Sequence, residues 1–272
     1  MNIISSKDNE LIKNIKKLKE KKYRDINNQY IIEGIKLIKE AIIEKANIKL
    51  IVICEECLVD GTIDKNLLYE IAKYECIYVT EKIFTQISDV KAPQGILAII
   101  EKGCKKGQID YSEDIIIALD GIQDPGNLGT ILRTVDSANL KQIIVSADTA
   151  DCYNPKVVRS TMGAIFRVNI IETAELETTL KEIKKHKFDV IVTSLDTEKS
   201  IYDIKYNKKV IVIGNEANGV SKEIQEMADT KVKIPMADEK IIIPMLGKTE
   251  SLNASVATSI IVYEYVRTEK IW

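Results

Sequence analysis

The feature that most constrains the fold is a series of short, continuously apolar segments in the second half of the chain, separated by segments with helical spacing. The first runs from Ile115 to Leu119. Strands that are apolar on both faces are typical of parallel sheets covered by helices on both sides. The expected strands are 115–119, 142–145, 166–171, 189–193 and 210–213, and the expected helices are 127–138, 175–186, 221–227 and 252–266. We therefore expect an α/β domain over residues 114–272, with its ligand site beyond the carboxyl ends of the strands.

A smaller α/β domain is expected in residues 1–104. Its expected helices are 7–22 and 35–45, and its expected strands include 29–33, 49–54 and 95–100. The stretch 101–108 is polar and contains two glycines, which indicates a connection between two domains. We place this linker at residues 105–113.

The composition predicts a soluble protein. Of the 272 residues, 45% are hydrophobic and 29% are charged, and no stretch approaches the roughly 20 apolar residues that cross a bilayer. The N-terminal residues lack the apolar core of a signal peptide, and with five cysteines we expect free thiols in a reducing cytoplasm. Cys54 and Cys57 have CxxC spacing, but a structural zinc site needs a second pair, and Cys76 and Cys104 stand alone. We therefore expect ordinary packing of these thiols and no bound metal.

Positive charge is concentrated near the N-terminus, although the formal net charge is −2. From Lys7 to Arg24 there are eight basic and three acidic residues, a local excess of five positive charges. Such a stripe can bind phosphates on an acidic protein, and the same pattern also suits a solvated helix face. The candidate phosphate-binding residues are Lys13, Lys16, Lys17 and Arg24.

The first segment with chemical character follows the strand that ends at Leu119. Asp124-Pro125-Gly126-Asn127 is a turn followed by a helix start, and Asn127 suits the N-cap position. A helix N-terminus binds anions through its free N–H groups. Arg133 lies six residues further on, in the same helix. A plain cap followed by a surface arginine is the simpler interpretation.

A glycine-bracketed loop, Gly214 to Gly219, follows the strand Val210–Ile213 and precedes a helix. Glycines allow the backbone to approach a ligand closely. The spacing is close to that of a P-loop, but Val220 stands where the phosphate-binding lysine is needed, which argues against a nucleotide triphosphatase. No G-x-G-x-x-G follows a strand, so a dinucleotide-dependent oxidoreductase is disfavoured as well.

The third segment contains Ile243-Pro244-Met245, followed by Ser251-Leu252-Asn253 at the start of a helix rich in small side chains. Together the three segments resemble the motifs of the SpoU/TrmH family of SPOUT RNA methyltransferases. Residues 127–134 look like the first motif, 213–219 like the second, and 243–245 with 251–257 like the third. The resemblance covers residues 114–272. The first part of the chain is similar to the family's N-terminal RNA-binding domain, through Tyr23-Arg24 and residues 30–34.

This resemblance implies a fold, a donor and a substrate. The C-terminal domain would contain a deep trefoil knot, an exception to the rule against threaded chains, and would form a homodimer. The methyl donor would be S-adenosylmethionine and the acceptor a ribose 2′-hydroxyl of structured RNA, with ribosomal RNA favoured over transfer RNA by the two-part layout. The residues expected to hold the donor are Gly214, Gly219, Leu252, and either Ile243 or Ile234.

The choice between these isoleucines arises because Ile234-Pro235-Met236 recurs nine residues later as Ile243-Pro244-Met245, where the family normally shows one such tripeptide. The first copy has the usual separation from Gly214, and the second has the usual separation from Leu252. We favour Ile243, because the resemblance implies that the segment next to Ser251 is held against the cofactor loop.

The resemblance also assigns roles to side chains. The attacking ribose oxygen needs alignment and stabilisation of its negative charge, and Arg133 can supply the second. A general-base role for Arg133 is the alternative, although an arginine with a pKa above about 12 resists deprotonation. Asn127 would orient ribose or phosphate, and Glu216 would fix its loop or Arg133. Ser251 and Asn253 would position the substrate and the arginine.

Other functions stay open at this stage. The sole histidine, His186, lies in a basic helix end and is expected to be exposed and uninvolved in catalysis. A catalytically silent RNA-binding protein would not need the five polar residues just named. A base-methylating SPOUT enzyme would lack the combined Asn…Arg and Ser-Leu-Asn pattern.

Overall fold

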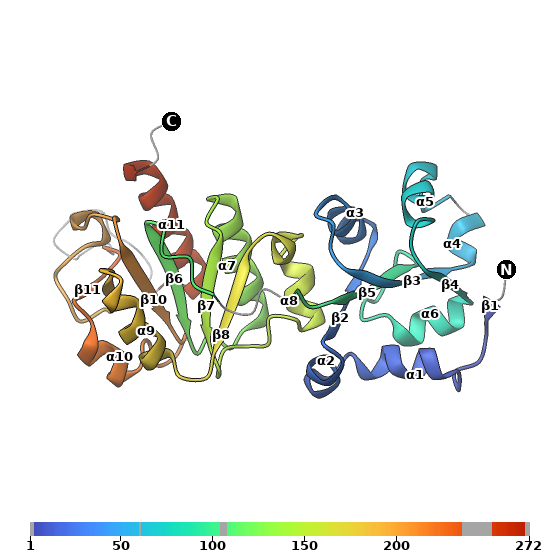
Figure 1. Ribbon diagram of the computed structural model, residues 1–272, viewed down its shortest axis with the longest axis horizontal. Coiled ribbons are helices and arrows are strands. Elements are labelled where there is room, and N and C mark those ends of the chain that lie inside the picture. The colour runs from blue at the N-terminus through green and yellow to red at the C-terminus, as the bar shows by residue number, and fades with distance from the viewer. Residues whose placement is uncertain (1–2, 60, 104–107, 236–251, 270–272) are drawn as a thin grey trace, which may run out of the picture. The chain divides into compact units, whose positions relative to one another are not determined.

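The structure is a computed structural model that describes residues 3–59, 61–103, 108–235 and 252–269. The chain divides into two compact units (Figure 1). Unit 1 comprises Met1–Lys106 and Asp151–Arg167, and unit 2 comprises Gly107–Ala150 and Val168–Trp272. No helix within the described ranges is long and apolar enough to cross a bilayer.

Unit 2 is built on a six-stranded sheet in the order β11-β9-β10-β6-β7-β8, in which every neighbouring pair is parallel. The strands are β6 (Ile115–Asp120), β7 (Gln142–Ser146), β8 (Asn169–Thr173), β9 (Asp189–Thr193), β10 (Lys209–Gly214) and β11 (Thr230–Val232). The predicted parallel sheet is confirmed. The third strand begins three residues later than predicted, because Ala164–Phe166 forms a 3-10 turn, and the short edge strand β11 was not predicted.

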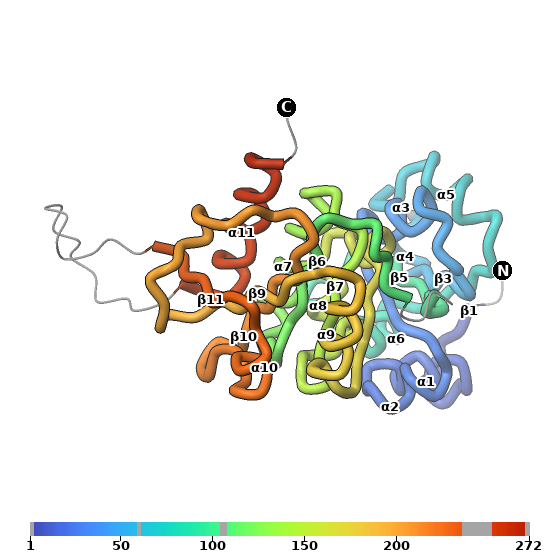
Figure 2. Tube along the Cα trace, turned by 60° about the vertical axis from the view of Figure 1, so that its left-hand side comes forward, coloured from blue at the N-terminus to red at the C-terminus, as the bar shows by residue number. Residues whose placement is uncertain are grey.

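The α-helices in the described residues of unit 2 are α7 (Pro125–Ser137), α9 (Leu176–Lys185), α10 (Lys222–Met227) and α11 (Ala254–Glu269). Side chains of α9 and α10 join Ile116, Ala118 and Val210 in one buried cluster on one face of the sheet. Helices α7 and α11 lie side by side on the other face (Figure 1, Figure 2), where the hydroxyls of Thr134 and Ser259 are 3.0 Å apart.

Unit 1 contains a mixed five-stranded sheet in the order β1-β4-β3-β5-β2. The strands are β1 (Ile3–Ile4), β2 (Gln29–Glu33), β3 (Ile48–Cys54), β4 (Cys76–Val79) and β5 (Ile96–Glu101). The helices are α1 (Glu10–Lys17), α2 (Lys21–Asn27), α3 (Ile35–Ile43), α4 (Glu56–Val59), α5 (Lys65–Ile71), α6 (Glu81–Ile87) and α8 (Pro155–Ser160). The predicted strands in this part of the chain therefore form, each within one residue of the expected bounds.

The predicted helix 7–22 is wrong, because the chain breaks there into α1 and α2. Leu18 ends α1 and is buried in the core, while Glu20 precedes α2 in an extended conformation and makes no side-chain capping bond. The guanidinium of Arg24 donates to the carbonyl oxygens of Leu18 and Lys19 at 2.8 and 2.6 Å. These carbonyls at the end of α1 are thus satisfied by a side chain instead of by a further helical turn.

One segment lies apart from its sequence neighbours. Residues 151–167 fall inside the predicted C-terminal domain, yet they pack with unit 1, where α8 contacts β2 and the rings of Tyr30 and Tyr153 are 4.9 Å apart. By contrast, residues 108–113 of the predicted linker pack with unit 2. There the backbone of Asp110 makes two hydrogen bonds with the side chain of Gln142, at 2.8 and 2.7 Å.

Candidate active site

A cavity of about 450 Å³ opens at the carboxyl ends of β9, β10 and β11. This is the edge of the sheet where a parallel α/β fold is expected to bind its ligand. Four residues predicted to hold the donor lie in its wall: Gly214, Gly219, Ile234 and Leu252. The other two predicted residues of this region, Ile243 and Ser251, lie outside the described residues.

The loop after β10 can close only because two of its residues are glycines. A Cβ on Gly214 would lie 2.1 Å from both the carbonyl carbon of Gly219 and the nitrogen of Val220. Gly219 has a φ of +69°, which residues with a side chain rarely adopt. The turn is closed by hydrogen bonds between Asn215 and Gly219, at 3.0 and 2.9 Å. The glycines therefore bring bare backbone to the wall of the cavity.

Asn215 fixes this loop from within, a role that was not predicted. Its side-chain nitrogen donates to the carbonyl of Gly121, which follows β6, at 2.7 Å. Its side-chain oxygen accepts hydrogen bonds from the backbone of Ala217 at 2.9 Å and of Asn218 at 3.1 Å. The position of Asn215 directly after a buried strand was the available signal.

A hydrogen-bonded chain of three side chains joins the three motifs. The amide nitrogen of Asn127 donates to Glu216 at 2.9 Å, and its amide oxygen accepts from Asn253 at 2.9 Å. Asn253 in turn caps α11 by accepting from the backbone of Ser255 at 3.0 Å. Residues that are 89 and 126 positions apart in the sequence thus meet at the ends of β10, α7 and α11. Three of the five predicted catalytic residues are brought together in this way.

The prediction that Asn127 is the N-cap of α7 is wrong. Helix α7 begins at Pro125, and Asp124 is the cap, with its carboxylate accepting from the backbone N–H of Asn127 at 2.8 Å. Proline is well suited to the first helical position because it has no N–H to satisfy. Asn127 therefore lies inside the first turn, where its side chain is free to bridge Glu216 and Asn253.

Arg133 projects from the exposed side of α7. Its side chain makes no hydrogen bond or ion pair with any residue that the structure describes. The carboxylate of Glu216 is instead directed to Asn127 and, at 3.4 Å, to the backbone of Gln123. Of the two roles expected for Glu216, fixing its own loop is the one that its contacts match.

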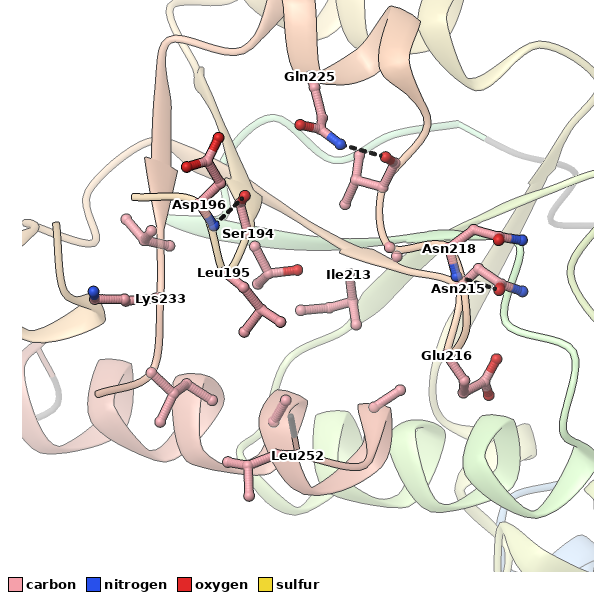
Figure 3. Close-up of a pocket in the computed structure, with 18 of the residues that line it drawn as sticks. Ser194, Leu195, Asp196, Ile213, Asn215, Glu216, Asn218, Gln225, Lys233 and Leu252 are labelled. Carbon is pink, nitrogen blue, oxygen red and sulfur yellow. Dashed lines mark hydrogen bonds between the residues drawn. The ribbon is translucent and has the colours of Figure 1, made fainter. Parts of the chain in front are cut away.

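The loop after β9 supplies a wall of the cavity that was not predicted. Figure 3 shows Ser194, Asp196 and Lys233 on one side of the cavity and Asn215 and Asn218 on the other. Leu195 is 63% exposed at this wall. The rule that ligands bind at strand ends would have found this loop had it been applied to the strand 189–193.

The predicted phosphate-binding residues divide into two kinds. Lys17 is exposed and Lys13 and Lys16 are half-buried, all on α1. Arg24 is 2% exposed, and its guanidinium is paired with Asp151 as well as with the two backbone carbonyls. Burial and a full set of acceptors withdraw Arg24 from contact with a phosphate, so its assignment as an RNA-binding residue is corrected to a structural one.

The remaining predicted features have structural roles. His186 is exposed, as expected, and stacks on Tyr111 with ring centroids 3.5 Å apart. Cys54 is buried, and burial raises the pKa of its thiol to about 12. The Sγ of Cys57 lies where a side chain on Gly95 would be, 2.2 Å from the Cβ position of that glycine. Both thiols are therefore packing residues of unit 1.

Comparison with known families identifies the two parts of the chain. Residues 114–263 match the model of the SpoU rRNA methylase family. The chain belongs to this family. Residues 9–98 match the MRM3-like substrate-binding domain. The SpoU/TrmH resemblance read from the three motifs is thus confirmed, and the protein is an RNA methyltransferase.

Named relatives of the chain are rRNA methyltransferases, and one of them matches it over nearly its whole length. It is 29% identical to the 23S rRNA (guanosine(2553)-2′-O)-methyltransferase RlmP of Bacillus subtilis, over 97% of this chain and 98% of that protein. It is 33% identical to the 23S rRNA (guanosine-2′-O-)-methyltransferase RlmB of Bordetella pertussis, over 64% and 70% of the two chains. The crystal structure of an AdoMet-bound rRNA methyltransferase from Sinorhizobium meliloti matches with a TM-score of 0.84 and 28% identity, over 98% of both chains.

Proposed function

We propose that this methyltransferase transfers a methyl group from S-adenosylmethionine to a ribose 2′-hydroxyl of ribosomal RNA. The observation that carries the proposal is the cavity at the ends of β9, β10 and β11, beside which Glu216, Asn127 and Asn253 form their hydrogen-bonded chain. Relatives named as 23S rRNA 2′-O-methyltransferases support the substrate, including one that matches this chain over nearly its whole length.

The cavity fits the donor in size and chemistry. A volume of about 450 Å³ lies within the usual range for small-molecule sites, roughly 300–1,000 Å³. Ile213, Ile234 and Leu252 supply apolar surface for a base, and the bare backbone at Gly214 allows close approach. When bound, the donor supplies a methyl carbon made electrophilic by its sulfonium. We keep Ile243 as a further contact on the strength of the family motif.

Arg133 is assigned the role of stabilising the negative charge that develops on the attacking ribose oxygen. It is exposed and has no competing partner among the described residues, so its guanidinium is available to an RNA phosphate and to the ribose oxygen. A preorganised cation lowers the energy of an oxygen that becomes negative in the transition state. The side chain acts electrostatically in this scheme and keeps its proton.

Asn127 and Asn253 act as positioning residues. The amide of Asn127 bonds to Glu216 and to Asn253, and the amide of Asn253 bonds to Asn127 and to the backbone at the start of α11, which fixes the loop after β10 against the starts of α7 and α11. Glu216 anchors the far end of the chain. Ser251 is assigned, from the motif, to hold the substrate beside them.

A trefoil knot and a homodimer through unit 2 complete the proposal. The resemblance places the knot in the C-terminal part of the chain, of which residues 236–251 lie outside the described residues. For the dimer, α11 exposes the large side chains of Val256 and Tyr263, which are 46% and 48% exposed. A second copy of the chain would cover these two side chains. We place the enzyme in the cytoplasm with its ribosomal RNA substrate.

The test is a map of 2′-O-methylated positions in total RNA from cells that lack the gene and carry wild type, Arg133→Ala or Arg133→Lys. Wild type should restore a methyl group on ribosomal RNA. Arg133→Ala should lower the single-turnover rate of methyl transfer on the order of a hundredfold to a thousandfold. Arg133→Lys should restore little of this rate, because an ammonium lacks the guanidinium fork.

Lys181→Ala, which removes an exposed cation from α9, is the matched control and should behave as wild type. A gene-dependent methyl group on transfer RNA instead of ribosomal RNA would show that transfer RNA is the substrate. Absence of any methyl group would indicate the silent RNA-binding protein. A folded Arg133→Ala enzyme within about threefold of wild type, a loss far below that of one preorganised donor, would remove Arg133 from the mechanism.

A further inference from the structure

Free positive charge in unit 1 is concentrated at the α1–α2 elbow, defined here as residues 17–24. Lys17, Lys21 and Lys22 are exposed and form no ion pair with any residue that the structure describes. The other lysines nearby are engaged: Lys13 pairs with Glu10 at 2.8 Å, and Lys16 donates to a side-chain oxygen at 2.8 Å. The elbow therefore offers three lysines, close together in the sequence, that an anion can bind without breaking an existing ion pair.

An aromatic ring lies at the centre of this charge. Tyr23 is half-buried on α2, and the ammonium groups of Lys17 and Lys22 are 5.7 and 5.8 Å from the centroid of its ring. Both distances are within the roughly 6 Å over which a cation is attracted to an aromatic face. Proteins that bind single-stranded nucleic acid combine such rings, on which bases stack, with cations that hold the backbone.

The buried Arg24 gives this arrangement its fixed geometry. Its guanidinium joins the last carbonyls of α1, at Leu18 and Lys19, to Asp151 across the core of unit 1. The neighbouring residue in the sequence is Tyr23. The angle between the two helices, and with it the approach of Lys17 to the ring, is thus held by an ion pair whose arginine is 2% exposed and whose carboxylate is 11% exposed.

We infer that Tyr23 is a stacking platform for an unpaired base of the RNA substrate, with Lys17 and Lys22 holding the phosphates on either side of that base. The inference rests on the proposed RNA methyltransferase function. An unpaired base is specified because the bases of a duplex are already stacked on one another, whereas those of loops and bulges are free to stack on aromatic side chains. Arg24 is a positioning residue in this scheme.

Tyr69 on α5 provides a contrast within the same unit. It is 72% exposed, and the ammonium of Lys73 lies 5.1 Å from its ring centroid. However, Lys73 is paired with Glu70 at 2.8 Å, so its charge is already neutralised. Tyr69 therefore tests whether an exposed tyrosine ring binds an RNA base without unpaired lysines beside it.

The experiment measures the binding of two fluorescein-labelled RNAs by anisotropy: a hairpin with a loop of unpaired adenosines, and the fully paired duplex of its stem. Tyr23→Leu keeps the apolar volume and removes the ring, so hairpin affinity should fall about fivefold to a hundredfold, the measured range for one stacked base. Duplex affinity should change less than about twofold, because lysine contacts to phosphates are retained. Tyr23→Phe and Tyr69→Leu should both match wild type.

A second readout needs no variant. Ultraviolet cross-linking of the wild-type protein to ribosomal RNA, followed by mass spectrometry, should place a nucleotide on the peptide that contains Tyr23. Equal losses for hairpin and duplex, an unchanged hairpin affinity, or cross-links confined to other parts of the chain would overturn the stacking inference alone. A wild-type protein that neither cross-links to ribosomal RNA nor methylates it would overturn the proposed function.

Discussion

Each unit of the molecule carries a helical arginine that the motifs singled out, Arg24 on α2 and Arg133 on α7, and the two have opposite surroundings. In unit 1, all three guanidinium nitrogens of Arg24 are hydrogen-bonded and the side chain is 2% exposed. In unit 2, Arg133 is exposed and has no partner among the described residues. A buried, fully paired arginine stabilises the fold, and a free one is available for a ligand. The difference teaches that an arginine inside a promising motif gains its role from what packs around it.

The largest effect is expected in unit 2, at the loop that shapes the cavity. Gly214→Ala should abolish binding of S-adenosylmethionine, because the new Cβ would lie 2.1 Å from backbone atoms of Gly219 and Val220 and the turn could not close. Isothermal titration calorimetry measures the loss, which should exceed about a hundredfold, the equivalent of roughly 2.7 kcal/mol. Gly103→Ala in unit 1 is the control, since nothing lies within 4 Å of its added carbon. Normal donor binding by Gly214→Ala would mean that the donor lies elsewhere.

The next effect separates the two arginines directly. Arg24→Met should lower the free energy of unfolding by about 3–5 kcal/mol, because it leaves the carboxylate of Asp151, which is 11% exposed, without its cation. Arg133→Met should change the same quantity by less than about 0.5 kcal/mol, as exposed substitutions usually do. Urea denaturation followed by circular dichroism measures both.

Adding Asp151→Leu to Arg24→Met should recover part of the loss, since an apolar pair can replace a buried ion pair. Equal stabilities of Arg24→Met and Arg133→Met would show that burial does not distinguish these arginines, and the contrast between the units would fail.

The smallest effect concerns the hydrogen-bonded chain of Glu216, Asn127 and Asn253 in unit 2. Asn127→Asp replaces the donor to Glu216 with a carboxylate, so two like charges meet where a 2.9 Å hydrogen bond was. The rate of methyl transfer should fall about tenfold at neutral pH, and stability should fall by no more than about 1.5 kcal/mol, the upper range for one hydrogen bond.

This defect should depend on pH in a defined direction. Adjacent carboxylates raise the pKa of one of the pair, so lowering the pH protonates it and restores a donor between residues 127 and 216. The ratio of variant to wild-type rate should therefore rise as the pH falls. Thr130→Ala, on the same helix but outside the hydrogen-bonded chain, should show no such trend. A ratio independent of pH would argue that Asn127 contacts the RNA itself.

The two units also differ in how much of them could be predicted from the sequence. The longer strands of both sheets were predicted because their apolar runs are continuous and local, whereas β1, β4 and β11 were not among the expected strands. The grouping of Asn127, Glu216 and Asn253 was predicted from the family motifs, and the parallel sheet brings their segments to one edge. The helix break before Lys21 and the burial of Arg24 could not be predicted, because the partner, Asp151, is 127 residues away in the sequence.

Two further misses have local causes. Asp124 and Asn127 are both good N-cap residues, and the proline at the first helical position decides between them. The strand β11 is three residues long and pairs at the edge of the sheet, so it has too few residues to show a period. In both cases the local sequence pattern covers too few residues to decide the structure by itself.

The placement of residues 151–167 in unit 1 has a practical consequence for anyone who wishes to produce the methyltransferase part alone. The polypeptide leaves unit 2 after Ala150 and rejoins it at Val168, so a single cut in the gene cannot separate the two units. A fragment that starts at residue 108 would carry α8 without the strand β2 against which it packs, leaving buried Cys152, Val157 and Val158 open to water. Each such valine forfeits about 1.5–3 kcal/mol of burial energy, and the exposed patch invites aggregation. A usable fragment would need a second edit that replaces 151–167 with a short polar turn.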